Sequence, residues 1–348
     1  MQSRKLGFEE SLEKDVVLTG RCIGCATCVV VCPFICLEYD EGQPKLVKKC
    51  ENCGICPGVC PKYNWSWSKG EEFVFGRQRE ENEEFGIYRQ LILAQANDGK
   101  ILEKCQDGGV VTALLIHALQ NSVIEGAALS GLTPDKPLYP VPKLATTLEE
   151  VLENAGTRYA YSPNMLAFQE GVKQRKKTLA FVGTPCQIHA IRKVQMFPLK
   201  KYSNLLQFTV GLMCTESFTY DGFFEKHLKE KMGIDLNDVE KMNIKGKILV
   251  YLKSGEAKSI PLSEVKQYTR ESCRICTDFS AELADISAGG LGLSGWTFII
   301  LRTEKGEKIF SDAVEAGMLK TKSVDEESFA LSLLTKLSKK KRMNSPRN

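Results

Sequence analysis

The spacing of cysteines near the N-terminus constrains this chain more than any other feature of its sequence. The pattern C-x2-C-x2-C-x3-C-P occurs twice, in CIGCATCVVVCP (residues 22–33) and in CENCGICPGVCP (residues 50–61). Three thiolates two residues apart can surround one face of an iron–sulfur cubane, and small residues between them let the backbone approach the sulfurs. The fourth ligand must come from elsewhere, and the proline that follows each run helps the chain to turn away.

The two runs together predict two [4Fe-4S] clusters in a ferredoxin-like segment, because in the bacterial pattern the fourth cysteine of each run binds the other cluster. The predicted ligand sets are Cys22, Cys25, Cys28 and Cys60 for one cluster, and Cys50, Cys53, Cys56 and Cys32 for the other. Residues 36–47, which lie between the runs, have the pattern of a strand, a turn containing glycine and a second strand. Zinc is the alternative metal, but it favours two separated C-x2-C pairs.

Six of the 14 cysteines lie outside the two runs. Four of them could bind a third [4Fe-4S] cluster if they converge in space, since they comprise one C-x2-C pair and two single cysteines that each follow a hydrophobic strand. These four are Cys186, Cys214, Cys273 and Cys276. The two single cysteines could instead be coincidental core residues. Cys36 and Cys105 are interpreted as packed free thiols.

Composition indicates a globular protein that works inside the cell. Hydrophobic residues make up 43% of the chain and charged residues 26%, which is enough for a core and ordinary for a soluble protein. No apolar run reaches the roughly 18 residues that span a bilayer, and the N-terminus lacks the apolar centre of a signal peptide. The net charge of +4 is too small to indicate nucleic acid binding. We therefore expect a cytoplasmic protein whose cysteines bind metal rather than form disulfides.

Apolar periodicity divides the chain into four parts and predicts an α+β protein. Residues 1–67 are expected to be the ferredoxin-like domain with two clusters, and the charged residues 68–86 a loose connector. Residues 87–320 alternate between strand and helix patterns, which indicates a mixed α/β domain. Residues 321–348 read as a C-terminal helix with a capping box at Ser323–Glu326 and a basic end. That end is expected to be solvated; a docking patch for an acidic partner or a membrane surface is the alternative.

Several stretches within the mixed domain carry clear local patterns. Residues 110–121 have helical periodicity, and residues 177–194 read as a buried strand, a tight turn and a helix. The proline-spaced residues 133–145 are expected to be irregular. GGLGLSG contains the literal spacing G-x-G-x-x-G, but a strand rather than a helix follows it, so the dinucleotide-binding interpretation fails its structural context.

Six motifs, in this order, resemble the β-subunit family of coenzyme F420-reducing hydrogenase: CQDGGVVTALLIHAL, TRYAYSPN, FVGTPCQIHAIRK, GLMC, CRICTDFSAELADISAGGLG and GWTFIILRTEKG. The resemblance covers about residues 87–310. With a ferredoxin-like segment in front, the chain looks most like the electron-input subunit of the F420H2 dehydrogenases of methanogens and related archaea. The hydrogenase β-subunit lacks that segment, so its partners need not be shared.

The resemblance implies FAD, a hydride exchanged with the deazaflavin coenzyme F420, and iron–sulfur clusters, the third of them on the four cysteines named above. It also implies cofactor contacts at the glycine-rich and SPN segments. Carried over to this sequence, these contacts are Gly108, Gly109, Thr112, Ser162, Asn164, Gly183, Thr184, Trp296 and Arg302. Arg158 is a candidate cationic contact for the phosphate and glutamate groups of F420, as are Arg192 and Lys193, although each could be a solvated surface residue.

These observations predict an F420H2 dehydrogenase subunit. It would oxidise reduced F420 by hydride transfer to FAD and pass single electrons through the clusters to a membrane-bound respiratory complex or to ferredoxin. A flavin is expected because a hydride carries two electrons, whereas a [4Fe-4S] cluster accepts one. The alternatives are an F420-handling β-subunit of a formate dehydrogenase or hydrogenase, and a cluster-only electron-relay subunit with no diffusible substrate.

Overall fold

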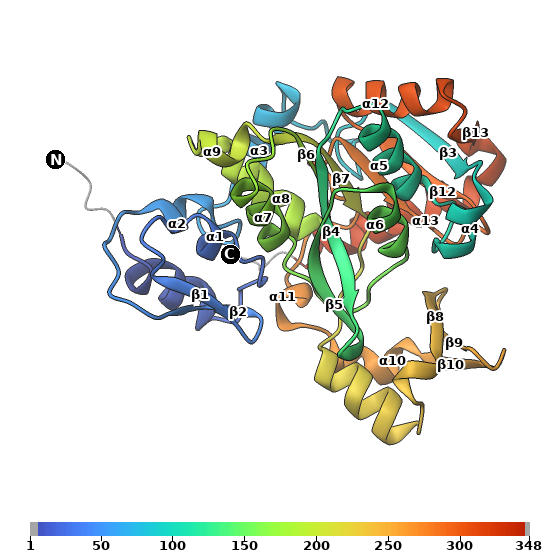
Figure 1. The fold of residues 1–348 in the computed structure, drawn as a ribbon, viewed down its shortest axis with the longest axis horizontal. Helices are drawn as coiled ribbons and strands as arrows, with labels where there is room; N and C mark the ends of the chain where they lie inside the picture. The colour runs from blue at the N-terminus through green and yellow to red at the C-terminus, as the bar shows by residue number, and fades with distance from the viewer. Residues whose placement is uncertain (1–5, 345–348) are drawn as a thin grey trace.

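A mixed sheet of eight strands lies at the centre of the computed structural model, which describes residues 6–344 (Figure 1). The strand order is β13-β3-β12-β11-β7-β6-β4-β5. The strands are β3 (Gln90–Ala96), β4 (Gly126–Thr133), β5 (Lys136–Ala145), β6 (Leu179–Gly183), β7 (Leu206–Leu212), β11 (Ile286–Gly289), β12 (Thr297–Leu301) and β13 (Leu319–Lys322). The expected mixed α/β domain is therefore confirmed. The expectations for residues 1–5 and 345–348 lie outside the described residues.

The four central strands β4, β6, β7 and β11 run parallel, and β5 and β12 lie antiparallel beside them. Successive side chains of a strand point to opposite faces of the sheet. On β6, Ala180 and Val182 pack into one hydrophobic core, whereas Leu179 and Phe181 pack into another. Because both faces are covered, these strands read in the sequence as continuous apolar runs.

Helices form the two layers that cover the sheet. One layer contains α4 (Gly99–Lys104), α5 (Val110–Gln120), α6 (Leu148–Glu153) and α12 (Glu304–Glu315); the other contains α7 (Met165–Lys173), α8 (Pro185–Met196), α9 (Lys200–Ser203) and α13 (Ser328–Arg342). The predicted helix at residues 110–121 is thus confirmed as α5. Helix α8 begins with a capping box between Thr184 and Gln187 and with proline at its first position, which explains the sharp change from strand to helix.

The expectation that residues 133–145 are irregular is wrong, because ten residues of this stretch form β5. The strand lies at the edge of the sheet, with β4 as its neighbour. Pro140 and Pro142 face Leu132 and Ser130 in the pairing register. An edge strand has hydrogen-bonding partners on one side only, so proline, which lacks an N–H group, is tolerated there.

The N-terminal part is built on the predicted hairpin. Strands β1 (Leu37–Asp40) and β2 (Gln43–Leu46) pair antiparallel. The π-helix η1 (Glu9–Val17) and the short helices α1 (Thr27–Val30) and α2 (Ile55–Val59) surround the hairpin and share a small apolar core with it. In Figure 1 this part, drawn in blue, lies beside α7 and α8.

The two cysteine runs adopt the same local backbone conformation. The third residue of each run is left-handed, with φ of +65° at Gly24 and +49° at Asn52. The fifth residue is also left-handed, with φ of +61° at Ala26 and +75° at Gly54, and in each run it directly precedes the short helix. Left-handed residues reverse the direction of the chain, so the cysteines of one run can face a common centre.

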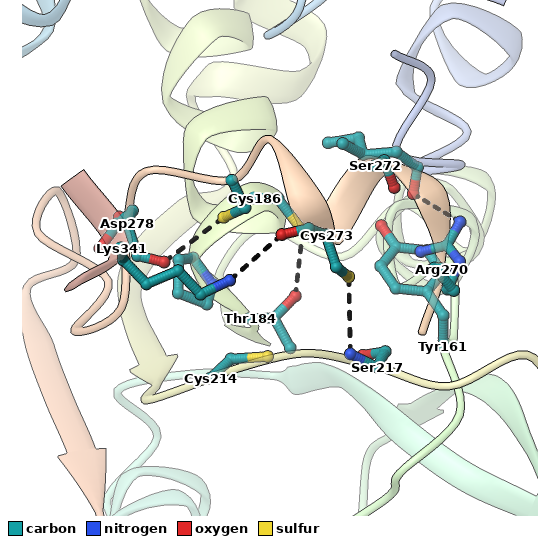
Figure 2. Close-up of a pocket in the computed structure, with 13 residues that line it drawn as sticks. Tyr161, Thr184, Cys186, Cys214, Ser217, Arg270, Ser272, Cys273, Asp278 and Lys341 are labelled. Atoms are coloured by element: carbon teal, nitrogen blue, oxygen red, sulfur yellow. Dashed lines mark hydrogen bonds between the residues drawn. The ribbon is translucent and has the colours of Figure 1, made fainter. Parts of the chain in front are cut away.

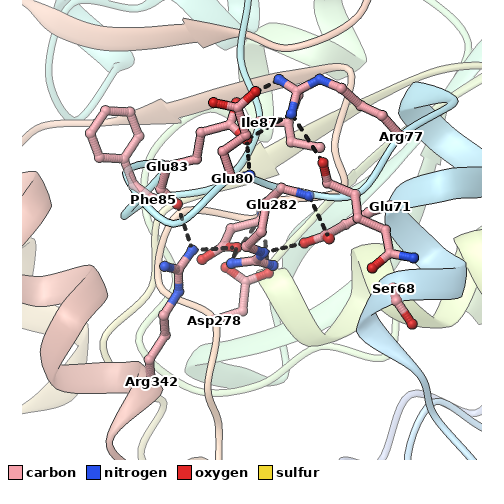
Figure 3. Close-up of polar contacts among 12 residues, drawn as sticks. Ser68, Glu71, Arg77, Glu80, Glu83, Phe85, Ile87, Asp278, Glu282 and Arg342 are labelled. Carbon is pink, nitrogen blue, oxygen red and sulfur yellow. Dashed lines mark hydrogen bonds and ion pairs between the residues drawn. The ribbon is translucent and has the colours of Figure 1, made fainter.

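The expectation of a loose connector at residues 68–86 is wrong. Its first half belongs to α3 (Trp67–Phe75), and Glu71 is only 3% exposed. Figure 3 shows the polar network that anchors the segment. The guanidinium of Arg79 pairs with Glu71 and lies 2.5 Å from Glu282, which also pairs with Arg342 of α13 at 3.0 Å. The ion pairs of Arg79 with Glu71 and Glu282 therefore anchor this segment, whereas its other charged side chains are exposed or half-buried.

A smaller lobe extends from one end of the central sheet (Figure 1, gold). It contains the π-helix η2 (Tyr220–Lys231), a sheet with the order β10-β9-β8 and its own apolar core. Its strands are β8 (Val239–Ile244), β9 (Lys247–Leu252) and β10 (Ala257–Pro261), and its short helices are η3 (Leu236–Asp238), α10 (Leu262–Val265) and η4 (Lys266–Tyr268). The division at residues 87–320 did not anticipate this lobe.

The C-terminal helix is confirmed in part. The capping box at Ser323 and Glu326 forms at η5 (Val324–Glu327), directly before α13. The expectation of a solvated basic end is wrong for Lys341, which is 7% exposed, and Arg342 is engaged with Glu282. None of the helices described is both long and apolar enough to span a membrane.

Candidate functional site

Four cysteines from separate segments of the chain line one pocket (Figure 2). Cys186 lies in the first turn of α8, and Cys214 follows β7. Cys273 lies in α11 (Glu271–Arg274), and Cys276 follows that helix. We call these residues the third cysteine group. The structure thus brings together the four thiols that the sequence predicted to share a cluster.

Burial dominates the electrostatics of this pocket. It raises the pKa of Cys186 to about 12 and the pKa of Cys214 well above its ordinary value, and the neighbouring thiols, first Cys276 and Cys273 respectively, raise both further. Burial alone would lower the pKa of the Lys341 ammonium, but the four thiols outweigh it and the pKa is raised. Thiolate is the form that binds metal, and burial destabilises its negative charge. A cationic centre in the pocket would stabilise the thiolates.

Within residues 6–344, no group of three or more Cys, His, Asp or Glu side chains is arranged to hold a metal ion. In a zinc site all four sulfurs lie about 2.3 Å from one ion. A cubane instead takes one thiolate at each of its four irons, which separates the ligands.

The eight N-terminal cysteines converge in the two predicted sets. Burial raises the pKa of Cys28 well above its ordinary value, and Cys25, Cys60, Cys22 and Cys56 add to the shift in that order. Burial raises the pKa of Cys56 to about 12, and Cys50, Cys53 and Cys32 add to it. Cys60 thus lies with the first run and Cys32 with the second, which is the exchange that the spacing predicted. We call the set with Cys60 the first cysteine group and the set with Cys32 the second.

The first and third cysteine groups adjoin each other. Ile23, between Cys22 and Gly24 in the chain, lines the pocket of the third group. It also packs in one small apolar cluster with Cys25, Cys186 and Ala190. Metal centres held by these two groups would therefore be neighbours.

Several of the predicted cofactor residues gather at one edge of the sheet. The carboxyl ends of parallel strands share an edge, and in open α/β sheets ligands bind there. Gly183 ends β6 and Thr184 follows it. The loop 105–109 meets the start of β12 at the same edge, where the Gly108 amide donates to the Thr297 hydroxyl at 3.0 Å. A Cβ atom on Gly108 would lie 2.6 Å from the carbonyl oxygen of Ala94, so only glycine fits. Thr112 lies buried in the first turn of α5, after Gly109.

Comparison with known proteins identifies the family. The model for the N-terminal part of the coenzyme F420 hydrogenase/dehydrogenase beta subunit matches residues 91–169, and the model for its C terminus matches residues 176–327. The coenzyme F420 hydrogenase subunit beta of Methanococcus voltae is 42% identical over 261 residues, which cover 74% of this chain and 92% of that protein. The chain belongs to the coenzyme F420 hydrogenase/dehydrogenase beta-subunit family.

Other relatives are also F420-linked oxidoreductases. A subunit of the F(420)H(2) dehydrogenase of Methanosarcina mazei is 35% identical over 59% of this chain and 58% of that protein. The coenzyme F420-dependent sulfite reductase of Methanocaldococcus jannaschii is 37% identical over 86% of this chain but only 47% of that protein. A chain of the F420-reducing [NiFe] hydrogenase complex from Methanosarcina barkeri, solved as a xenon derivative, covers 76% of this chain and 92% of its own length with a TM-score of 0.73 and 36% identity. The resemblance seen in the motifs is confirmed, as is the mixed α/β fold.

Only one of the three cysteine groups lies within the residues that the family models match. The third cysteine group falls within the residues matched by the model for the C terminus of the beta subunit. The first and second groups precede residue 91 and lie outside both family models. The third group therefore lies in the region that the family models match, whereas the other two lie outside it.

Two of the residues carried over from the beta-subunit family brace the sheet edge. The Asn164 amide donates to the carbonyl of Val182 at 2.8 Å and accepts hydrogen bonds from the hydroxyls of Ser162 and Ser130. These bonds link α7 with β4 and β6. The SPN segment therefore has a structural role that does not depend on a cofactor.

Arg302 is not available to a phosphate, contrary to expectation. It is 1% exposed, and its guanidinium donates to the Ser287 hydroxyl, the Ile87 carbonyl and the backbone of Phe85 and Ser280. Burial lowers its pKa to about 10, against the raising effect of the neighbouring acids. An arginine at the end of a strand has the same sequence pattern whether its side chain is buried in the core or binds a ligand.

The two other cationic candidates, Arg192 and Lys193, also form ion pairs or hydrogen bonds within the protein. Arg192 pairs with Asp285 at 3.0 Å. Lys193 donates to the carbonyl of Cys60 at 2.8 Å and to that of Tyr63, which joins α8 to the N-terminal part. Both are buried, so neither is a surface contact for F420.

Arg158 has one buried nitrogen without a partner, and Trp296 is partly buried beside two lysines. The Arg158 guanidinium donates to two backbone carbonyls, but its Nε atom is buried without a partner. Burial lowers its pKa to about 10. The indole of Trp296 is partly buried, and the ammonium groups of Lys322 and Lys320 lie 4.8 and 5.7 Å from its ring centroid. The family signature did not single out these lysines.

Proposed function

We propose that this chain is an iron–sulfur flavoprotein that oxidises reduced coenzyme F420 with bound FAD and passes single electrons to a partner. The observation that carries the proposal is the convergence of the third cysteine group on one pocket that adjoins the first group. Membership of an F420-linked oxidoreductase family supports the substrate. The role that we propose for this chain is that of the F(420)H(2) dehydrogenase subunit.

The chemistry requires a two-electron acceptor next to one-electron carriers. When bound, FAD would supply the first property and [4Fe-4S] clusters the second. This chain would hold its three cubanes with twelve thiols: Cys22, Cys25, Cys28 and Cys60; Cys50, Cys53, Cys56 and Cys32; and Cys186, Cys214, Cys273 and Cys276. The burial and mutual proximity of these thiols support cluster binding. Several buried thiolates are stable next to one another only when cations lie between them.

The residues at the sheet edge fit an anionic, planar ligand. Gly108 and Gly290 are positions where a Cβ atom would collide with other atoms of the protein, so glycine lets the loops pack closely at this edge. The buried Nε of Arg158 lacks an acceptor, which a phosphate or carboxylate oxygen would provide. In the proposal, FAD and F420 share this edge, with Gly109, Thr112, Gly183 and Thr184 lining the approach.

The positions of the cysteine groups suggest where electrons leave. The third group belongs to the domain that would bind F420, the first adjoins it, and the second shares the apolar core of the N-terminal part with the first. We therefore propose exit through the N-terminal part to a partner. That partner would be a component of a respiratory complex at the cytoplasmic face of a membrane, or ferredoxin. The cytoplasmic location remains a prediction.

The test is spectroscopy of the full-length protein purified without oxygen. Flavin absorption that bleaches on addition of F420H2 but not of NADH, with about twelve irons per chain, is the expected result. A loaded protein whose spectrum shows clusters without flavin would contradict the proposal and support an electron relay. About eight irons would contradict the assignment of a cluster to the third group.

A further inference from the structure

The hydroxyl of Tyr161 has no hydrogen-bond partner although it is buried. Buried tyrosine hydroxyls usually find a partner, so an orphan of this kind needs an explanation. Tyr161 lines the pocket of the third cysteine group (Figure 2). Among thiols, it interacts most strongly with Cys186 and then with Cys25 of the first group. The phenol thus lies at the junction of two sets of predicted ligands.

Arg270 links the same two groups. Its guanidinium carbon lies 4.0 Å from the centroid of the Tyr161 ring, a cation–π contact that holds the ring in place. Its Nη2 atom donates to the carbonyl of Ile23 at 3.1 Å. The positive charge acts on Cys22 of the first group and on Cys273 of the third.

We propose that Tyr161 and Arg270 are positioning residues shared by two adjoining clusters. The Tyr161 hydroxyl donates a hydrogen bond to a sulfur of the centre bound at the third cysteine group, and Arg270 fixes the phenol and places its charge between the first and third groups. This inference rests on the proposed function, because it requires clusters at both groups. An added electron makes a cluster more negative, so a donated hydrogen bond and a nearby cation both favour the reduced form.

The measurement is a potentiometric titration, followed by electron paramagnetic resonance, of the full-length, cluster-loaded protein. At a fixed solution potential, Tyr161→Phe should lower the ratio of reduced to oxidised third cluster by about tenfold, the effect of one hydrogen bond to a charged group. Arg270→Gln should lower the ratio for the first and third clusters, and Arg270→Lys should retain most of it. The second cluster, which neither residue contacts, should be unchanged.

Tyr202→Phe is the matched control. The Tyr202 hydroxyl is also buried, but it donates to the carbonyl of Val30 at 2.7 Å and does not line the pocket. This variant should titrate like the wild-type protein. A water molecule that satisfies Tyr161 would leave the third cluster unchanged in Tyr161→Phe, and that result would overturn the inference.

Iron content separates this inference from the proposed function. If the wild-type protein lacks iron at the third group, the proposed function fails. If the wild-type protein and both variants hold about twelve irons and the ratios do not differ, only the roles of Tyr161 and Arg270 fail. If Tyr161→Phe loses iron, the test depends on Arg270→Gln. Unchanged ratios of reduced to oxidised first and third clusters in Arg270→Gln would then overturn the inference.

Discussion

The ammonium group of Lys341 donates a hydrogen bond to the carbonyl oxygen of Cys273 at a distance of 3.4 Å. The C-terminal helix thereby delivers a buried cation to the third cysteine group, although the two residues are 68 positions apart in the chain. A helix end that reads as solvated in the sequence is part of the candidate site. This relationship leads to the first prediction.

Lys341→Met should make the third cluster harder to reduce. Loss of a buried positive charge should lower the ratio of reduced to oxidised third cluster by about tenfold at a fixed potential, with the first and second clusters unchanged. The same potentiometric titration measures it. Lys340→Met is the control, because the neighbouring Lys340 is exposed. Equal shifts in the two variants would show that the position of Lys341 does not matter.

Gly24→Ala should cost the protein one cluster. Gly24 has φ of +65°, and a Cβ atom there would lie 2.4 Å from the carbonyl oxygen of Gly42. The left-handed conformation alone costs about 1–2 kcal/mol for an L-residue, before the clash is counted. We expect iron to fall from about twelve to about eight per chain, as measured by iron assay.

Gly99→Ala is the control for that substitution. Gly99 has ordinary φ, and no atom lies within 4 Å of its hypothetical Cβ. It should keep its full iron content. If Gly24→Ala keeps it too, the first run does not need the observed backbone conformation.

Arg302→Met should destabilise the protein strongly. The substitution leaves buried carbonyls, including that of Ile87, without the guanidinium that now lies 2.9 Å away. Loss of a buried, fully hydrogen-bonded charge costs about 3–5 kcal/mol. Urea denaturation should show a large decrease in the midpoint. Arg89→Met, which removes an arginine whose side chain is 43% exposed, should change stability by less than about 1 kcal/mol. Similar midpoints for the two variants would argue against a core role for Arg302.

Asp285→Asn should change the acid dependence of stability. Burial would raise the pKa of this carboxyl, but Arg192 and hydrogen bonds from Thr303 and Thr209 outweigh it and hold the pKa below its ordinary value of 3.8. A folded-state pKa below the unfolded-state pKa means that the stabilisation is complete above the unfolded value of about 3.9 and is lost as the pH falls through the folded value. At pH 7 we expect the variant to be less stable by about 3 kcal/mol.

The difference between wild type and Asp285→Asn should therefore narrow as the pH falls below about 3.9. Urea titrations at a series of pH values measure it. Asp135→Asn, at an exposed position, should track the wild-type protein throughout. A difference that stays constant down to about pH 2 would contradict the assigned role of the carboxylate.

Local patterns predicted much of this fold because the forces involved are local. The hairpin β1–β2, helix α5 and the capping box at Ser323 follow from turn chemistry, periodicity and hydrogen bonds between residues close in sequence. Strand β5 was missed because its prolines oppose a strand locally, and only its place at the sheet edge permits them. Helix α3 was missed because the charges of its segment are paired with Glu282, which is distant in sequence.

The sequence by itself predicted the two N-terminal cysteine sets, since their fixed spacings encode ligand geometry, and determined the family, since several motifs occur in a fixed order. Only the tertiary structure decided which polar residues face the candidate site. The side chains of Arg302 and Lys193 donate hydrogen bonds to backbone carbonyls, whereas Tyr161, Arg270 and Lys341 line the pocket of the third cysteine group. The physical reason is that a buried charge or hydroxyl must find a partner, and in a folded chain that partner comes from whichever distant segment the packing brings near.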